Sequence, residues 1–154
     1  MFRNNCFVGI DATKNYKYSQ KMSKKVYRKT IHQEVEFNAK PHEVYELLMD
    51  PKKHSGFTGS KCEVSRKVGG KINCYDGYID GENIELIQDK KIVQKWRGKD
   101  FPDGHYSTVS FKLQEKDGKT VLKFIHENVP DGKQEHLNKG WKEQYWDKMK
   151  KYLS

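Results

Sequence analysis

An amphipathic pattern at the C-terminal end of the sequence constrains the fold more than any other feature. Between residues 130 and 153 the apolar side chains recur at steps of about four residues, which is typical of one face of an α-helix. A helix from about Glu135 to Leu153 would be roughly 28 Å long. Its aromatic side chains stabilise the protein only when they are buried, so the preceding chain must provide a surface that receives them. The apolar residues are Leu137, Trp141, Tyr145, Met149, Tyr152 and Leu153.

Gly140 stands inside this predicted helix, directly before Trp141. Glycine costs about 1 kcal/mol relative to alanine in a helix interior. Its presence suggests a close approach to another backbone or a hinge over a pocket, although a tolerated glycine is the alternative.

Alternating apolar and polar residues predict strands through most of the remaining chain. In the first strand, Ile31, Val35 and Phe37 share one face, which Gln33 interrupts. Two short helical segments follow, separated at Asp50–Pro51 because a residue before proline is disfavoured in helical conformation. The hairpin signals Asp76–Gly77 and Asp117–Gly118 then connect antiparallel strands.

The cysteines indicate a reducing compartment. The chain has three, Cys6, Cys62 and Cys74, an odd number without a CxxC motif, so neither a disulfide framework nor a zinc site is indicated. If the turn at Val68–Gly70 pairs the flanking strands, Cys62 faces Cys74 and Val64 faces Ile72 on one inner face. A disulfide is conceivable there, but we expect two small buried apolar side chains.

The order of elements predicts an α+β fold. It consists of a curved antiparallel sheet of about seven strands wrapped on a long C-terminal helix, with two short helices after the first strand. We assign residues 26–154 to this domain and expect residues 1–25 to form a disordered basic extension. The space between sheet and helix is the default place for a ligand.

The net charge of +9 is concentrated in the first residues. Residues 1–30 contain eight Lys or Arg and one acid, whereas residues 31–154 contain 22 bases and 20 acids. A nearly balanced body gives no surface for reading nucleic acid, so we expect no specific nucleic-acid partner. We also expect no membrane span and a cytoplasmic location.

Several short motifs point to a known family. They are Phe57-Thr58-Gly59, Gly69-Gly70-Lys71, Asp76-Gly77 with Gly81, Ile92-Val93 leading to Trp96-Arg97, Phe101-Pro102-Asp103-Gly104-His105, and Gly140-Trp141 with Tyr145. Through these motifs, residues 30–153 resemble the domain of the activator of the heat-shock protein 90 ATPase. That family belongs to the helix-grip superfamily, which includes START domains and the birch-pollen allergen.

The resemblance implies a helix-grip fold and a co-chaperone-like role. In the eukaryotic activator this domain is the C-terminal half, which contacts the nucleotide-binding domain of the chaperone. The expected partner is therefore a heat-shock protein 90 family chaperone, whose ATPase the protein would stimulate. The separate N-terminal domain of the activator has no counterpart in residues 1–29.

Two groups of residues are candidates for function. Exposed aromatic side chains commonly anchor partners, which makes Phe101 and Trp146 candidates for partner contact. The second group could line a hydrophobic cavity for an apolar small molecule or simply fill it, since interiors are usually close-packed. It comprises Phe57, Trp96, His126, Trp141 and Tyr145.

An enzyme is a third hypothesis. No nucleophile, phosphate-binding or metal-binding motif is present, and the histidines show no metal spacing, so we expect no catalytic residue, metal or cofactor. His126 lies on the apolar side of its strand and could serve as an acid or base in a cyclase-like or hydrolase-like enzyme. A hydrogen-bonded core histidine is the alternative.

Overall fold

A computed structural model describes residues 29–154, and the predicted extension 1–25 lies outside them. Seven strands form one antiparallel sheet in the order β2-β8-β7-β6-β5-β4-β3, so the predicted fold class is confirmed. The first strand of the series pairs with the last, and every other strand pairs with its neighbour in sequence. The strands are β2 (Lys29–Phe37), β3 (Cys62–Val64), β4 (Lys71–Cys74), β5 (Ile79–Ile87), β6 (Lys91–Gly98), β7 (Ser107–Lys116) and β8 (Lys119–Val129).

Two short helices, α1 (Pro41–Met49) and α2 (Pro51–Thr58), follow β2 as predicted. Asp50 separates them in an extended conformation, and its carboxylate accepts hydrogen bonds from the backbone of Lys52 and Lys53. This is the usual N-cap arrangement, in which a side-chain oxygen satisfies amides that a helix start leaves free. The buried side chains of α2 include His54 and Phe57.

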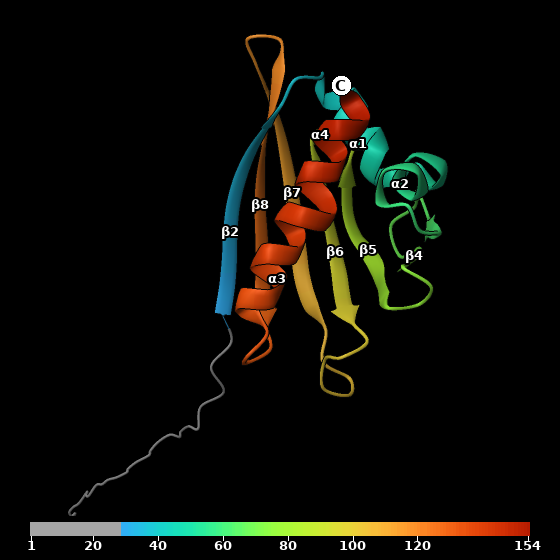
Figure 1. The fold of residues 1–154 in the computed structure, drawn as a ribbon. Helices are drawn as coiled ribbons and strands as arrows, with labels where there is room; N and C mark the ends of the chain where they lie inside the picture. The colour runs from blue at the N-terminus through green and yellow to red at the C-terminus, as the bar shows by residue number, and fades with distance from the viewer. Residues whose placement is uncertain (1–28) are drawn as a thin grey trace, which may run out of the picture.

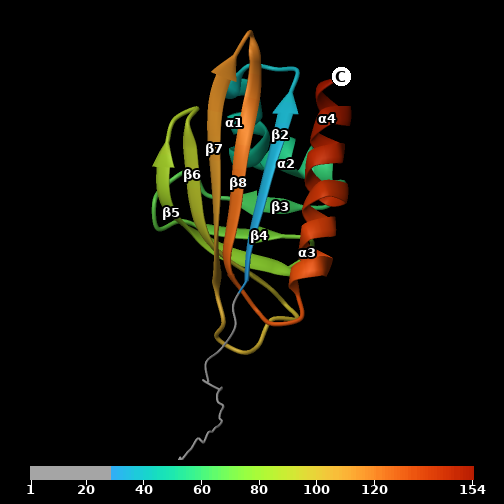
Figure 2. The same cartoon turned by 90° about the vertical axis from the view of Figure 1, so that its left-hand side faces the viewer.

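The C-terminal helix runs across the concave side of the sheet (Figure 1). It consists of α3 (Gln134–Gly140), a π-helical turn η1 (Trp141–Trp146) and α4 (Asp147–Leu153). Figure 2 shows that the helices all lie on one side of the sheet, so no described helix covers the other face. The predicted apolar stripe is buried from Leu137 to Met149, whereas Tyr152 is 48% exposed.

The π-helical turn changes which side chains face the sheet. In a π-helix the hydrogen bonds join residues five apart, and here the amide of Asp147 donates to the carbonyl of Lys142. Trp141 and Trp146, also five apart, stack with ring centroids 5.7 Å apart and an interplanar angle of 21°. The turn therefore brings Trp146 onto the buried face, which a regular α-helix would not do.

The register at the sheet edge agrees with the sequence, but the state of the cysteines does not. Val64 faces Ile72 and Cys62 faces Cys74, as predicted. The two cysteine sulfurs form a disulfide. The expectation of two unbonded thiols is therefore wrong, because directly facing positions of an antiparallel pair bring the two Cβ atoms within reach of a bridge.

Gly81 on β5 lies opposite Trp96 on β6. A Cβ atom at this position would overlap the carbonyl oxygen of Lys95. A close approach to another backbone, which was one expectation for Gly140, therefore occurs at Gly81 instead. At Gly140, by contrast, an added Cβ would have no neighbouring atom within 4 Å and would lie in open space.

Candidate functional site

An aromatic cluster joins the C-terminal helix to the centre of the sheet. The Trp141 ring lies 4.5 Å from Phe124 of β8 and 5.4 Å from Trp96 of β6, measured between ring centroids. Tilted and edge-to-face pairs at such distances are the arrangements that aromatic quadrupoles favour. The enclosed space left beside this cluster is only about 10 Å³, so most of the interior between sheet and helix is filled.

His126 lies inside this cluster at the centre of a chain of hydrogen bonds. The indole Nε1–H of Trp141 donates to His126 Nδ1 over 3.0 Å. Because an indole nitrogen can only donate, the imidazole carries its own proton on Nε2, which lies 2.7 Å from Ser107 Oγ. The Ser107 hydroxyl in turn donates to the carbonyl of Trp96 over 2.7 Å. Each polar atom in the chain has a partner.

These hydrogen bonds give His126 a structural role in the core of the protein. Its exposed fraction is 0%, and burial lowers the pKa of the imidazole from 6.5 to about 3. The hypothesis that His126 faces a solvent-reachable cleft as an acid or base is therefore wrong. The alternative, a hydrogen-bonded core histidine, describes what the structure contains.

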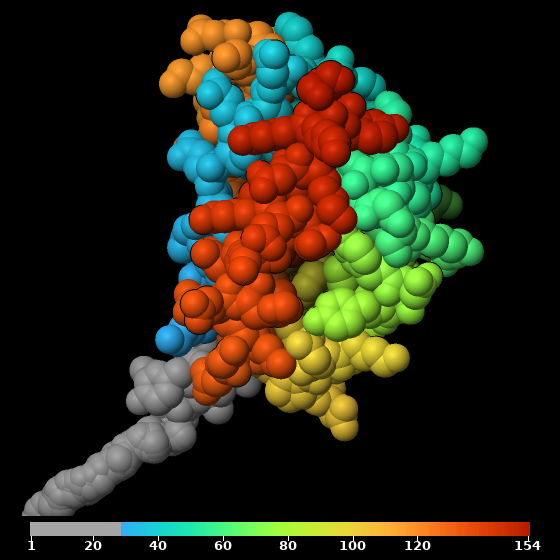
Figure 3. Space-filling model, viewed as in Figure 1, coloured from blue at the N-terminus to red at the C-terminus, as the bar shows by residue number. Residues whose placement is uncertain are grey.

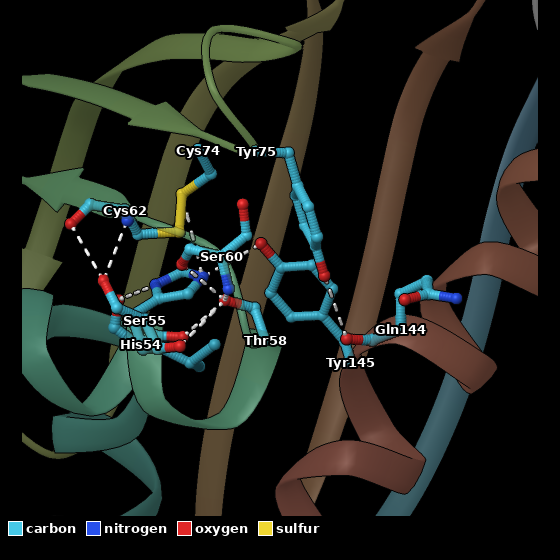
Figure 4. Close-up of a disulfide and its surroundings, with 10 residues drawn as sticks. His54, Ser55, Thr58, Ser60, Cys62, Cys74, Tyr75, Gln144 and Tyr145 are labelled. Atoms are coloured by element: carbon cyan, nitrogen blue, oxygen red, sulfur yellow. Dashed lines mark hydrogen bonds between the residues drawn. A yellow bond between two sulfur atoms is a disulfide. The ribbon is translucent and has the colours of Figure 1, made fainter.

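His54 of α2 forms a second buried hydrogen-bonded link to the C-terminal helix. Its Nδ1–H donates to the carbonyl of Leu48 over 3.0 Å, which leaves Nε2 to accept from the Tyr145 hydroxyl over 2.9 Å. Phe57 stacks on the imidazole with ring centroids 5.0 Å apart. Burial lowers the pKa of His54 to about 4, against a smaller opposing effect of the Leu48 carbonyl. Figure 4 shows this imidazole beside the Cys62–Cys74 disulfide.

An open pocket of about 360 Å³ lies between the C-terminal helix and the turn that joins β4 to β5. Figure 3 shows the hollow between the orange helix and the yellow-green residues. Its polar groups include the Tyr78 hydroxyl, which donates to Asp100 Oδ1 over 2.8 Å. The lining residues are Tyr75, Tyr78, Ile79, Trp96, His136, Gly140, Trp141, Gln144 and Tyr145.

Ion pairing and burial set the charges at the rim of this pocket. Lys133 Nζ lies 3.1 Å from Asp100 Oδ2. Partial burial raises the pKa of Asp100, but hydrogen bonds from Tyr78 and Lys133 outweigh it and hold that pKa below the usual value. Burial, followed by the bond to Asp100, raises the pKa of Tyr78 to about 12. The rim therefore holds the neutral phenol of Tyr78 beside the ionised carboxylate of Asp100, whose charge is balanced by Lys133.

The five predicted cavity residues separate into two groups. Trp96, Trp141 and Tyr145 line the open pocket. Phe57 and His126 lie in the filled interior instead. The sequence reasoning missed Tyr75 and Tyr78, which reach the pocket from a turn. Gly140 also lines the pocket, and the hinge suggested at this glycine stays a prediction.

Phe101 and Trp146 are both buried, so the expectation that they are exposed is wrong. Phe101 is 5% exposed and packs edge-to-face on Trp96, while Arg97 Nη2 donates to the Phe101 carbonyl over 2.9 Å and fixes the loop. Trp146 is 3% exposed, and its indole donates to Gln33 Oε1 over 2.6 Å. This bond also explains why a polar Gln33 interrupts the apolar face of β2.

The uncovered face of the sheet carries a cationic and apolar surface. Lys112 of β7 and Lys123 of β8 are exposed and lie directly opposite each other. Among residues 29–154, neither makes an ion pair with a carboxylate. The neighbouring row of the same face holds the half-buried Val93 and Ile125 on either side of Ser110. We call these five residues the outer patch.

Within residues 29–154, no helix combines the length and apolar character needed to cross a membrane.

The chain is similar to activators of the heat-shock protein 90 ATPase. It is 31% identical over 114 residues to the human "Activator of 90 kDa heat shock protein ATPase homolog 1", an alignment that covers 74% of this chain and 34% of the relative. A Dictyostelium discoideum homologue is 32% identical over 136 residues, which are 86% of this chain and 35% of the relative. The chain thus spans about a third of the length of the curated relatives it matches.

A solved structure gives the same relationship. The crystal structure of an HSP90 activator from Plasmodium falciparum superposes with a TM-score of 0.77 at 29% sequence identity, covering 80% of this chain and 95% of that one. The family model described as "Activator of Hsp90 ATPase homolog 1-like protein" matches residues 38–154. Every described helix and strand except β2 lies within that match, and the chain belongs to this family.

Proposed function

We propose that this protein is a cytoplasmic co-chaperone that binds a heat-shock protein 90 chaperone and stimulates its ATPase. The observation that carries the proposal is the match to the Plasmodium falciparum HSP90 activator, which extends over 95% of that chain. The filled interior supports a binding module, because the aromatic side chains between sheet and helix hold the domain together and leave little enclosed space.

The outer patch is the surface that we assign to the chaperone. Like charges directly opposite each other on a sheet repel, and Lys112 lies opposite Lys123, which has Glu34 of β2 as its partner on the other side. A carboxylate-rich partner surface would relieve that repulsion on binding. The adjacent Val93 and Ile125 supply apolar area beside the charges, and an apolar centre with a polar rim is the usual composition of an interface.

The first experiment measures the ATPase rate of a heat-shock protein 90 chaperone with increasing amounts of this protein, together with direct binding by calorimetry. We expect saturable binding at micromolar concentrations and a faster rate of hydrolysis. Absence of binding in that range would refute the co-chaperone proposal as a whole.

A pair of charge-reversal variants tests the surface separately. Lys112→Glu combined with Lys123→Glu should weaken chaperone binding about tenfold or more, with a smaller effect at high salt because exposed charges are screened. The matched control reverses two exposed lysines on the C-terminal helix, Lys142→Glu with Lys150→Glu, and should bind like the wild type. Equal affinity of both double variants would exclude the outer patch while leaving the co-chaperone role intact.

The open pocket supports a second candidate function, the binding of an apolar small molecule. A volume of about 360 Å³ and a mainly aromatic lining fall within the range of small-molecule sites. Gly140→Leu would place a side chain at the pocket, where nothing lies within 4 Å of the added Cβ. A hydrophobic fluorescent probe should bind the wild type and be excluded by this variant, and equal probe binding would dismiss the pocket as a ligand site.

A further inference from the structure

Three metal-binding side chains meet beneath the C-terminal helix. The ligand atoms of His54, Cys62 and Cys74 lie within 4.8 Å of one another. His54 comes from α2, and the two cysteines come from facing positions of β3 and β4. All three side chains are buried, with exposed fractions of 6%, 3% and 2%. One imidazole and two thiolates form a donor set typical of zinc and other thiophilic metals.

The imidazole has the tautomer that coordination requires. Its Nδ1–H donates to the carbonyl of Leu48 over 3.0 Å, so Nε2 carries the lone pair. That lone pair now accepts from the Tyr145 hydroxyl, a hydrogen bond that a metal ion would replace. Histidines that bind metals almost always donate their other ring N–H in this way, which fixes the tautomer. His54 Nε2 lies 3.9 Å from Cys74 Sγ. Two ligands of a tetrahedral zinc ion would be roughly 3.6 Å apart, given Zn–S and Zn–N bonds of about 2.3 and 2.05 Å.

We propose that the reduced protein binds one thiophilic metal ion such as Zn²⁺ through Cys62 Sγ, Cys74 Sγ and His54 Nε2. Metal binding would free the Tyr145 hydroxyl, 2.9 Å from His54 Nε2, from that hydrogen bond and leave its oxygen next to the fourth position. The site would then connect α2, the β3–β4 hairpin and the C-terminal helix through one ion.

The disulfide and the metal complex exclude each other. A dithiol reductant transfers two electrons and two protons to the Cys62–Cys74 disulfide, becomes a disulfide itself and leaves two thiols. The metal ion then binds two thiolates, and the two thiol protons pass to solvent. Metal occupancy therefore depends on the redox state of the surroundings, and a compartment that keeps thiols reduced favours the metal-bound form.

Cobalt(II) is a suitable probe because thiolate coordination gives charge-transfer absorption in the near ultraviolet and tetrahedral geometry gives intense visible bands. The full chain carrying Cys6→Ser is divided into an oxidised and a phosphine-reduced sample, and the reductant is removed before titration. We expect one Co²⁺ per reduced chain with both signatures, displacement by Zn²⁺, and no binding to the oxidised sample. A reduced chain with native circular dichroism that binds no Co²⁺ would overturn the proposal.

Variants then identify the ligands. Cys74→Ser should remove the thiolate charge-transfer band, and His54→Ala should weaken Co²⁺ binding at least about tenfold, since even outer-shell partners are worth about 10–100-fold. His136→Ala is the control, because His136 is an exposed histidine outside the cluster. X-ray absorption of the zinc form should give two sulfur neighbours at about 2.3 Å. An unchanged Co²⁺ spectrum in Cys74→Ser would refute the assigned site without relying on the fold of the His54 variant.

Discussion

Acidification should destabilise this protein through His126, and the size of the effect follows from its burial. The folded-state pKa of about 3 lies below the value of 6.5 for the unfolded chain, so the unfolded state binds more protons as the pH falls. The contribution of His126 is fully present above pH 6.5 and is lost progressively down to the folded-state pKa. Between pH 6.5 and 5 this amounts to about 1.6 kcal/mol, because the unfolded imidazole is half protonated at pH 6.5 and the full slope of 1.36 kcal/mol per pH unit is reached only below it.

His54 should also destabilise the folded protein as the pH falls over this interval, because burial lowers its folded-state pKa to about 4. The two histidines together should therefore reduce the free energy of unfolding by about 3 kcal/mol between pH 6.5 and 5. Urea denaturation followed by tryptophan fluorescence at several pH values measures this slope, provided that unfolding is two-state. The interval stays above pH 5 to limit the titration of exposed carboxylates.

The variant His126→Gln isolates the contribution of one imidazole. Glutamine keeps a donor and an acceptor for Ser107 and Trp141 but does not titrate, so the slope should fall to about half that of the wild type. The absolute stability of the variant does not enter the comparison, because only the pH dependence is used. A variant slope equal to that of the wild type would show that His126 does not bind the proton on unfolding and would refute the reasoning.

Three further substitutions test the packing. Gly81→Ala should cost about 1–3 kcal/mol in thermal or urea denaturation, because its Cβ would overlap the Lys95 carbonyl; a neutral result would contradict that contact. Gly140→Ala should instead raise the free energy of unfolding by about 1 kcal/mol, since Gly140 is helical and its added methyl group meets no atom within 4 Å. A loss of stability would mean that the helix needs glycine at this position. Trp146→Phe leaves Gln33 Oε1 without its donor and should cost about 1–3 kcal/mol, which would be disproved by wild-type unfolding in urea.

Local rules were sufficient to predict most of the fold. Asp76–Gly77 and Asp117–Gly118 adopt positive φ values at both positions, as the two-residue hairpin signal requires, and the alternation beside them sets the register of the strands. The long helix was predicted from the four-residue spacing of its apolar side chains. Each of these signals depends on residues close in sequence, which is why the sequence alone carries them.

The errors concern contacts that local patterns do not contain. Trp146 becomes buried because a π-helical turn places it above Trp141, whereas an α-helical projection puts it outside the stripe. Phe101 is buried against Trp96, and Arg97 donates a hydrogen bond to its carbonyl, contacts between residues that the local pattern does not connect. The pairing of Cys62 with Cys74 was predicted, but the choice between thiols and a disulfide rested on an assumed compartment rather than on geometry.

Because β2 pairs with β8 and the helix follows every strand in sequence, many contacts of the fold can form only late in synthesis. The side chain of Gln33 donates a hydrogen bond to the carbonyl of Asn138, 105 residues later in the sequence, so this bond cannot form until Asn138 has been synthesised. The helix leaves the ribosome after every strand, so the concave aromatic face formed by Trp96, Phe111 and Phe124 is uncovered until translation has passed residue 153. We therefore expect the nascent chain to expose this apolar surface, of the kind that chaperones shield, until the helix docks.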